Sequence, residues 1–201
     1  MKRQRSPRKI FKISENEAVY YAYQKDQLGT GHAVATGLEE VNKQQWQPSE
    51  VLVGYGDHTM FYKQEKVKEL INLHKKNNAA VSLLTFKYYD PNEIKYGRIV
   101  RDEQGFVMGI VEQKDATPEQ LKIEEVNPGF YCFDFSFLNK NINKLIKSKI
   151  SNEYYITDMI KIAVDQGKKV VGLPIAFSEA GLGINTAEEI TESEKIYLQK
   201  K

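Results

Sequence analysis

Cysteine is nearly absent from this sequence of 201 residues, because Cys132 is the one example. A single thiol can form no internal disulfide and no zinc site built from thiolates, which excludes both as sources of stability. The sequence also has no run of about 18 apolar residues, and no apolar stretch follows its basic start, MKRQRSPRKI. We therefore expect neither a membrane span nor a secretory signal, and we expect a cytoplasmic protein.

Short motifs of several enzyme classes are missing too. No G-x-x-x-x-G-K-[ST] pattern occurs, and Val34 stands where the dinucleotide pattern G-x-G-x-x-G needs its third glycine. The three histidines, His32, His58 and His74, are not spaced as H-E-x-x-H, and no serine lies in G-x-S-x-G. These absences argue against P-loop, dinucleotide, metalloprotease and α/β-hydrolase chemistry, and they leave the histidines most simply as structural residues.

Charge is nearly balanced, with 29 Lys and Arg against 27 Asp and Glu. Five of the basic residues fall in the first ten positions, so the rest of the chain has 24 against 27 and is mildly acidic. Residues 1–16 form a basic tail that is either a frayed terminus or a contact for nucleic acid or an anionic surface. The tail has no interleaved aromatic residues and no nucleic-acid fold motif accompanies it, which disfavours nucleic acid as a partner.

Hydrophobic periodicity predicts strands that alternate with helices. Apolar runs predict strands at residues 17–24, 51–56, 80–86, 129–135 and 170–177, and helical spacing predicts helices at 30–42, 67–78, 137–146, 157–166 and 187–198. The run at 51–56 is almost continuously apolar, as in a strand covered on both faces. This order predicts an α/β domain with a mixed, mostly parallel sheet and helices on both faces.

One part of the pattern is antiparallel. The apolar pairs at 99–100 and 106–111 flank Glu103-Gln104-Gly105, and glycine there suits a turn with unusual backbone angles. We therefore expect a hairpin added to the sheet.

Two loops at predicted strand ends are candidates for binding. Residues 27–32 (QLGTGH) lie between a strand and a helix, where glycine lets a ligand approach the backbone, although a plain tight turn explains them equally well. Tyr55-Gly56-Asp57 ends a strand with a carboxylate that can hold Mg²⁺ against phosphate oxygens. The alternative is that Asp57 or Thr59 caps the next helix.

Taken together, seven motifs resemble one enzyme family. In order they are QKDQLGTGHA from Gln24, VLVGYGD from Val51, YGRIVRD from Tyr96, IVEQKDAT from Ile110, IEEVNPG from Ile123, NEYYITD from Asn152 and GIN from Gly183. In sequence and spacing they are similar to the uridyltransferase (pyrophosphorylase) domain of bacterial N-acetylglucosamine-1-phosphate uridyltransferases. The resemblance covers residues 17–185 and implies a Rossmann-like nucleotidyltransferase fold.

The resemblance also implies roles for individual residues. The nucleotide would be held by Gln24, Gly29 and Thr30 at the uracil and by Tyr55 and Gly56 along its length, and the metal ligands would be Asp57 and Asn185. The sugar and its neighbouring ribose would be held by Gly97, Glu112 and Asn127, with Glu153, Tyr155 and Thr157 closing over the N-acetyl side. The implied reaction converts UTP and N-acetylglucosamine 1-phosphate to UDP-N-acetylglucosamine and pyrophosphate, with Mg²⁺ as the cofactor and Asp57 and Asn185 as the catalytic residues.

The chain departs from that family at its start. Family members have a glycine-rich phosphate loop after their first strand, whereas no glycine precedes Gln24 here. We therefore expect a partial nucleotidyltransferase domain at 17–201 that lacks the first strands and leaves the 51–56 strand exposed along one side. A partner chain or a homo-oligomer could complete such a sheet. Two alternatives stay open: a non-catalytic sugar-nucleotide-binding or regulatory module, and a related glucose-1-phosphate uridylyl- or thymidylyltransferase.

Overall fold

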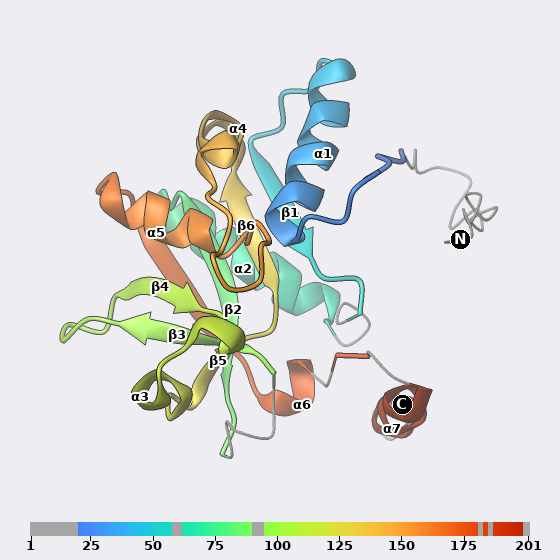
Figure 1. The fold of residues 1–201 in the computed structure, drawn as a ribbon, viewed down its shortest axis with the longest axis vertical. Coiled ribbons are helices and arrows are strands. Elements are labelled where there is room, and N and C mark those ends of the chain that lie inside the picture. The colour runs from blue at the N-terminus through green and yellow to red at the C-terminus, as the bar shows by residue number, and fades with distance from the viewer. Residues whose placement is uncertain (1–19, 58–61, 90–94, 181–182, 185–186, 199–201) are drawn as a thin grey trace.

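The computed structural model describes residues 20–57, 62–89, 95–180, 183–184 and 187–198. The helices are α1 (Thr30–Lys43), α2 (Gln64–Asn77), α3 (Pro118–Leu121), α4 (Phe135–Asn141), α5 (Asp158–Asp165), α6 (Phe177–Ala180) and α7 (Ala187–Leu198), with 3₁₀ turns η2 (Gln113–Asp115) and η3 (Ile142–Lys144). The strands are β1 (Glu50–Gly54), β2 (Val81–Lys87), β3 (Gly97–Arg101), β4 (Val107–Val111), β5 (Glu125–Asn127), β6 (Phe130–Asp134) and β7 (Val170–Pro174). Figure 1 shows their arrangement.

The described strands form one seven-stranded sheet in the order β1-β6-β2-β5-β3-β4, with β7 beside β2. The expected predominance of parallel pairs is wrong for these strands, because only β2 and β7 pair in parallel. Strand β6 lies between β1 and β2 and runs opposite to both. Apolar periodicity indicates only which strands are buried, and a buried strand can be parallel or antiparallel to its neighbours. The pattern therefore could not predict the direction of β6.

Burial on both faces of β2 explains why this strand is central. Val81 and Leu83 face one core cluster, whereas Leu84 and Phe86 face another. Helices α1, α4 and α5 contribute to the first cluster and α2 and α6 to the second. Each fully buried side chain of this size contributes about 1.5–3 kcal/mol. The prediction of helices on both faces is confirmed.

Strand β1 lies at the edge of the described sheet. Leu52 is 42% exposed, although its backbone pairs with Cys132 of β6. Strand β1 is therefore not covered on both faces, and among the described strands it pairs with β6 alone. Residues 20–24 form no strand, while 17–19 lie outside the described part. Instead, the Tyr20 ring packs edge-on against the Trp46 ring, with the ring centres 4.6 Å apart. The tyrosine that favoured a strand therefore makes an aromatic contact outside the sheet.

Two further predicted elements, a helix and a strand, have different ends. Helix α4 starts two residues early because a carboxylate oxygen of Asp134 accepts the Phe137 N–H at 2.7 Å, and it gives way to a 3₁₀ turn after Asn141. Strand β7 ends at Pro174, before the predicted end at 177, and helix α6 begins at Phe177. The predicted hairpin is confirmed as β3 and β4, with Gly105 at φ +84°. Helix α7 has the predicted bounds.

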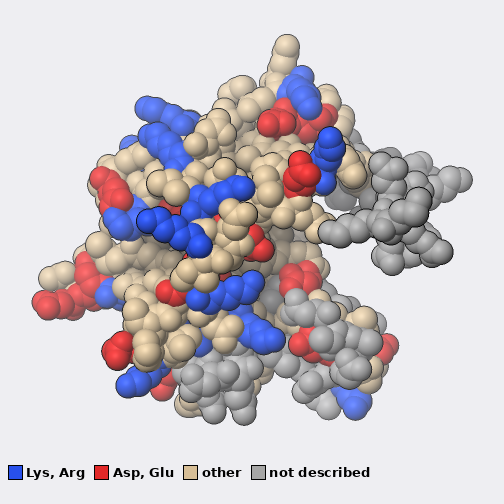
Figure 2. Space-filling view, in the orientation of Figure 1, with Lys and Arg blue, Asp and Glu red and all other residues tan. Residues whose placement is uncertain are grey.

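Charged side chains of both signs are spread over the face shown in Figure 2. Pairs at the surface, such as Lys43 with Glu40 at 3.7 Å, contribute little to stability. No helix in the described part of the chain is long and apolar enough to cross a membrane.

Candidate functional site

Backbone hydrogen bonds join the turn before α1 to the segment before α5. The Tyr154 N–H donates to the Leu28 carbonyl and the Gly31 N–H donates to the Tyr154 carbonyl, each at 2.8 Å. The Thr30 hydroxyl accepts the Ile156 N–H at 3.0 Å across 126 residues of sequence. These bonds hold two of the recognised motifs, QLGTGHA and NEYYITD, against each other.

Gly29 is required for this approach. Its φ is +101°, and a Cβ at this position would lie 2.5 Å from the Tyr154 carbonyl oxygen and 2.9 Å from Glu153 Cβ. Any other residue would therefore be strained by its backbone angle and would collide with the facing segment. The structure thus places Glu153 beside Gly29, two residues that the resemblance assigned to opposite ends of the ligand.

The Gln24 side chain lies over this turn. Its amide nitrogen is 3.4 Å from the Gly29 carbonyl oxygen and 2.8 Å from Nδ1 of His32. The contact with His32 was not anticipated from the sequence, where the histidine was assigned only a structural role.

Tyr55 follows β1 and packs on a second close glycine. Its N–H donates to the Gly129 carbonyl at 3.1 Å, and a Cβ on Gly129, whose φ is +79°, would lie 2.2 Å from the Tyr55 ring. Burial and the nearby Glu112 carboxylate raise the pKa of Tyr55 to about 12, while hydrogen bonds with Tyr131 and Thr30 oppose the shift. Tyr55 is therefore a neutral phenol that links the Thr30 turn to the sheet.

Asn127 continues this line of contacts across the sheet. Its side-chain N–H donates to the Tyr131 hydroxyl at 2.6 Å, and its side-chain oxygen accepts the Gly129 N–H at 3.1 Å. Gly97 pairs with Asn127 in the β3–β5 register. The amide of Asn127 is therefore held in one orientation by its neighbours.

Glu112 and Thr157 lie at the end of the candidate site away from the Gly29 turn. The Thr157 hydroxyl donates to a Glu112 carboxylate oxygen at 2.8 Å. A Cβ on Gly97 would lie 3.5 Å from the second carboxylate oxygen, so the glycine leaves space beside it. Burial raises the pKa of Glu112, with smaller contributions from the Asp158 and Asp115 carboxylates, while the Thr157 hydrogen bond opposes the shift.

The loop before α5 has its own support. The Ser148 hydroxyl donates to both carboxylate oxygens of Asp115, at 3.3 and 3.1 Å. The Tyr155 hydroxyl donates to the Ser151 hydroxyl at 2.5 Å, so this buried tyrosine is anchored within its own loop. Lys147 lies 5.4 Å from the centre of the Tyr154 ring. The loop therefore presents a preformed surface beside Glu112.

Asp57 lies near the segment that leads to Asn185. The Asp57 carbonyl accepts the Ile184 N–H at 3.1 Å, and the Tyr96 hydroxyl accepts the Gly183 N–H at 2.9 Å. Asn185 itself lies outside the described residues. Asp57 does not cap α2, because Lys63 occupies the position that precedes this helix, and the alternative residue Thr59 lies outside the described part.

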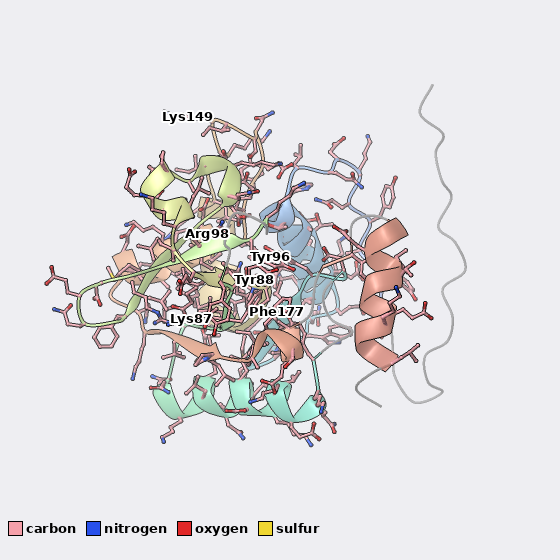
Figure 3. All side chains as sticks on the ribbon, turned by 90° about the horizontal axis from the view of Figure 1, so that it is seen from below. Lys87, Tyr88, Tyr96, Arg98, Lys149 and Phe177 are labelled. Carbon is pink, nitrogen blue, oxygen red and sulfur yellow. The ribbon has the colours of Figure 1, made fainter. Side chains whose placement is uncertain are left out.

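Aromatic residues surround this end of the site. Burial is the main cause that raises the pKa of Tyr96 to about 12 and also raises that of Tyr62, and the charge of Asp57 contributes to both shifts. Figure 3 shows Tyr88, Tyr96 and Phe177 gathered together, and the Tyr88 and Phe177 rings are 5.1 Å apart. Asp57 therefore lies near the neutral phenol side chains of Tyr62 and Tyr96.

Several of these residues were missed from the sequence. Tyr96 had an available signal, because it precedes Gly97 in the YGRIVRD motif. His32 lies in the QLGTGHA motif but was given no binding role, and Tyr131 had no signal, since only the folded chain brings its hydroxyl to Asn127. Gly56 lies next to Asp57, and no atom is within 4 Å of where its Cβ would be. The other predicted residues, apart from Asn185, take part in the contacts above.

The donor set suits a metal ion shared with a phosphate. Within the described residues, no group of three or more His, Cys, Asp or Glu side chains could hold an ion alone. Mg²⁺ is commonly held by one or two carboxylates together with substrate phosphates and water. The single carboxylate of Asp57 fits that arrangement.

Comparison with known proteins identifies the family. The family described as nucleotidyl transferase matches residues 2–178. The chain belongs to the nucleotidyl transferase family. Among the relatives of this nucleotidyl transferase chain, the bifunctional protein GlmU of Caldicellulosiruptor saccharolyticus is 40% identical over 186 residues, which is 92% of this chain and 39% of that protein. GlmU of Enterococcus faecalis is 37% identical over 187 residues, which is 93% of this chain and 40% of that protein.

Solved structures share the fold. A nucleoside-diphosphate-sugar pyrophosphorylase from Vibrio cholerae RC9 gives a TM-score of 0.64 at 16% identity, covering 86% of this chain and 67% of that one. A UDP-glucose pyrophosphorylase in complex with UDP-glucose gives 0.61 at 18% identity, covering 89% and 65%. The predicted nucleotidyltransferase fold is confirmed. The chain spans about two-fifths of the length of the GlmU relatives it matches.

The close approach at Gly29 yields a stability prediction. Gly29→Ala should destabilise the fold by about 2 kcal/mol or more, because it adds a strained backbone angle and a collision with Tyr154. Gly37→Ala is the matched control on α1, where a Cβ meets open space, and it should stabilise by about 0.5–1 kcal/mol. Urea unfolding measures both, and equal effects of the two substitutions would contradict the assigned constraint.

The raised pKa of Glu112 yields a second prediction. Because the folded protein disfavours the charged form, wild-type stability falls as pH rises through the ordinary and then the raised pKa of this carboxyl. Glu112→Gln should therefore melt at a higher temperature than wild type at pH 8, and the difference should vanish below about pH 4. Glu119→Gln, at an exposed position of α3, should show no such difference. A lower melting temperature for Glu112→Gln across the whole range would refute the buried-charge account.

Proposed function

We propose that this chain provides the site at which UTP and N-acetylglucosamine 1-phosphate form UDP-N-acetylglucosamine and pyrophosphate. The observation that carries this proposal is the continuous line of contacts from the Gly29 turn through Tyr55 and Asn127 to Glu112. The two ends of that line suit the two ends of a nucleotide sugar. We place the reaction in the cytoplasm, with UTP and the sugar phosphate as partners.

The uridine half would lie on the turn before α1. Gln24 offers an amide to the edge of the base, beside the turn that precedes α1. Tyr55 and Gly56 then lead along the chain to Asp57, where the phosphates would meet the metal. Asn185 follows the Gly183–Ile184 segment that is bonded to Tyr96 and Asp57.

The sugar half would lie against Glu112. Its ionised carboxylate can accept hydrogen bonds from sugar hydroxyls, and Thr157 already donates to one of its oxygens. Asn127, held by Tyr131 and Gly129, has an amide hydrogen left for a ligand. Glu153 and Tyr155 would close over the N-acetyl group.

The proposed chemistry depends on alignment and charge. The sugar phosphate is already an anionic nucleophile, so the protein needs to supply no general base and instead has to position the two substrates for in-line attack at the α-phosphorus. Asp57 and Asn185 would hold Mg²⁺, which, when bound, neutralises phosphate charge. The neutral phenols of Tyr55 and Tyr96 add no competing negative charge near Asp57.

The motifs that resemble N-acetylglucosamine-1-phosphate uridyltransferases support an N-acetylated sugar over glucose in this proposal. The same site could belong to a module that binds the nucleotide sugar without catalysing a reaction. A partner chain or second copy that pairs with the exposed edge of β1 could complete the sheet. Release of pyrophosphate from UTP and N-acetylglucosamine 1-phosphate distinguishes an enzyme from a module. Glucose 1-phosphate and thymidine triphosphate, tested in parallel, identify the preferred sugar and nucleotide.

Binding of the product tests the site itself. Calorimetry with UDP-N-acetylglucosamine should show an affinity that rises when Mg²⁺ replaces EDTA. Asp57→Asn should remove this gain, by about 10-fold or more, because a charged ligand is lost. Asp165→Asn, at an exposed carboxylate at the end of α5, should preserve it. An unchanged Mg²⁺ effect in Asp57→Asn would show that the metal is held elsewhere, and absence of binding to wild type would overturn the proposed function.

A further inference from the structure

The hydroxyl of Ser148 has every one of its hydrogen-bonding positions occupied. It donates to the carboxylate of Asp115, whose two oxygens lie 3.3 and 3.1 Å away. Its oxygen accepts the N–H groups of Ile150 and Ser151, at 3.1 and 3.2 Å. The direction of each bond is fixed, because a backbone N–H can only donate and a carboxylate oxygen accepts. The single hydrogen and both lone pairs of this hydroxyl are therefore used.

The backbone at Ser148 closes the same loop, residues 148–155, which we call the Ser148 loop. The Ser148 N–H donates to the Glu153 carbonyl and the Asn152 N–H donates to the Ser148 carbonyl, each at 2.9 Å. The Glu153 N–H in turn donates to the Ser151 hydroxyl at 3.3 Å. Both backbone groups of Glu153 are thus bonded within the loop, so the position of its side chain depends on the shape of the loop.

The two ends of the Ser148 loop are held separately. Near its C-terminal end, backbone bonds of Tyr154 join it to the turn before α1, and Thr157, just beyond it, donates to Glu112. At its N-terminal end, Ser148 meets Asp115 across 33 residues of sequence. Asp115 and Glu112 belong to one 3₁₀ turn, in which the Asp115 N–H donates to the Glu112 carbonyl at 2.9 Å. The same turn therefore holds both ends of the loop.

Loss of the Ser148 hydroxyl would remove the partner of three groups, the Asp115 carboxylate and the N–H groups of Ile150 and Ser151. Ser148 and Asp115 are both half-buried, so water would replace these bonds incompletely. The loop would then take several conformations in the free protein. A ligand that contacts the loop would have to order it on binding, which lowers affinity, whereas a ligand that does not reach the loop would bind as before.

We propose that Ser148 is a positioning residue that fixes the Ser148 loop before the substrate binds and so supports the sugar half of the site. This inference rests on the proposed function, because that proposal assigns Glu153 and Tyr155, both in the loop, to the N-acetyl side of the ligand. Ser148 acts through the loop and not by contact with the ligand. The uridine half has its own support, since Tyr154 holds the turn before α1 through its backbone.

Amide hydrogen exchange of the ligand-free protein, measured by NMR, tests the positioning. Ser148→Ala should speed exchange of the Asn152 and Glu153 N–H groups about 10-fold or more. Neither of these groups bonds to the Ser148 hydroxyl, so faster exchange there reports a change in the whole loop. Ser148→Thr, which keeps a hydroxyl, should exchange at close to the wild-type rate. The matched control is Ser136→Ala, which removes an exposed hydroxyl that donates to Asp134 at 3.1 Å and should leave the loop unchanged.

Titration calorimetry with UDP and with UDP-N-acetylglucosamine, both with Mg²⁺ present, separates the two halves of the site. Ser148→Ala should weaken binding of the nucleotide sugar about 5- to 10-fold and leave the affinity for UDP unchanged. Ser148→Thr and Ser136→Ala should both resemble wild type.

Three results would overturn the role of Ser148 and leave the proposed function standing. They are unchanged exchange at Asn152 and Glu153 in Ser148→Ala, an equal loss of affinity for the two ligands, and a loss of the same size in Ser148→Thr. Failure of wild type to bind either ligand would instead overturn both proposals.

Discussion

The pair of backbone hydrogen bonds that Tyr154 makes to Leu28 and Gly31 is the constraint on which the site depends. These bonds join the start of α1 to the segment before α5 and leave no space for a side chain at Gly29. The carbonyl that orients Gln24, the hydroxyl of Thr30 and the backbone leading to Thr157 are positioned together as a result. A change in this contact would therefore disturb both halves of the proposed ligand site.

The sheet holds the other residues of the candidate site in place. Strand β2 is buried on both faces, and β6 beside it carries Tyr131, whose hydroxyl meets Asn127. The close packing of Tyr55 on Gly129 then links the end of β1 to the turn that precedes β6. Glu112 lowers the stability of the folded protein, because burial disfavours the charged form of this carboxylate and raises its pKa. A group of this kind is retained at functional sites in spite of its effect on stability.

The sequence predicts the fold class and most of the elements, because helical spacing and continuous apolar runs report which surfaces are buried. It does not predict that β6 runs between β1 and β2 in the opposite direction, since burial alone has no direction. Residues 20–24 are rich in tyrosine and have strand propensity, but they form no strand, and the Tyr20 ring packs against Trp46 instead. The short strand β5 lies within the IEEVNPG motif and the short helix α3 follows the IVEQKDAT motif, and neither element was predicted from the sequence.

The candidate site follows the same division. Residues such as Asp57, Glu112 and Thr157 were identified because their motifs resemble those of a family, and most of the set is linked in the fold. Tyr131, Tyr96 and His32 act on those residues through tertiary contacts, which leave no periodic trace in the sequence. The motif therefore identified the residues assigned to the ligand, whereas the structure identified the residues that orient them.

The most direct test of the central claim is a crystal structure with UDP-N-acetylglucosamine and Mn²⁺, in which anomalous scattering locates the metal. The account predicts an ion about 2 Å from the Asp57 carboxylate, the uracil against the turn before α1 and the sugar beside Glu112. An ion bound away from Asp57, or a ligand that lies outside the line from Gly29 to Glu112, would contradict it.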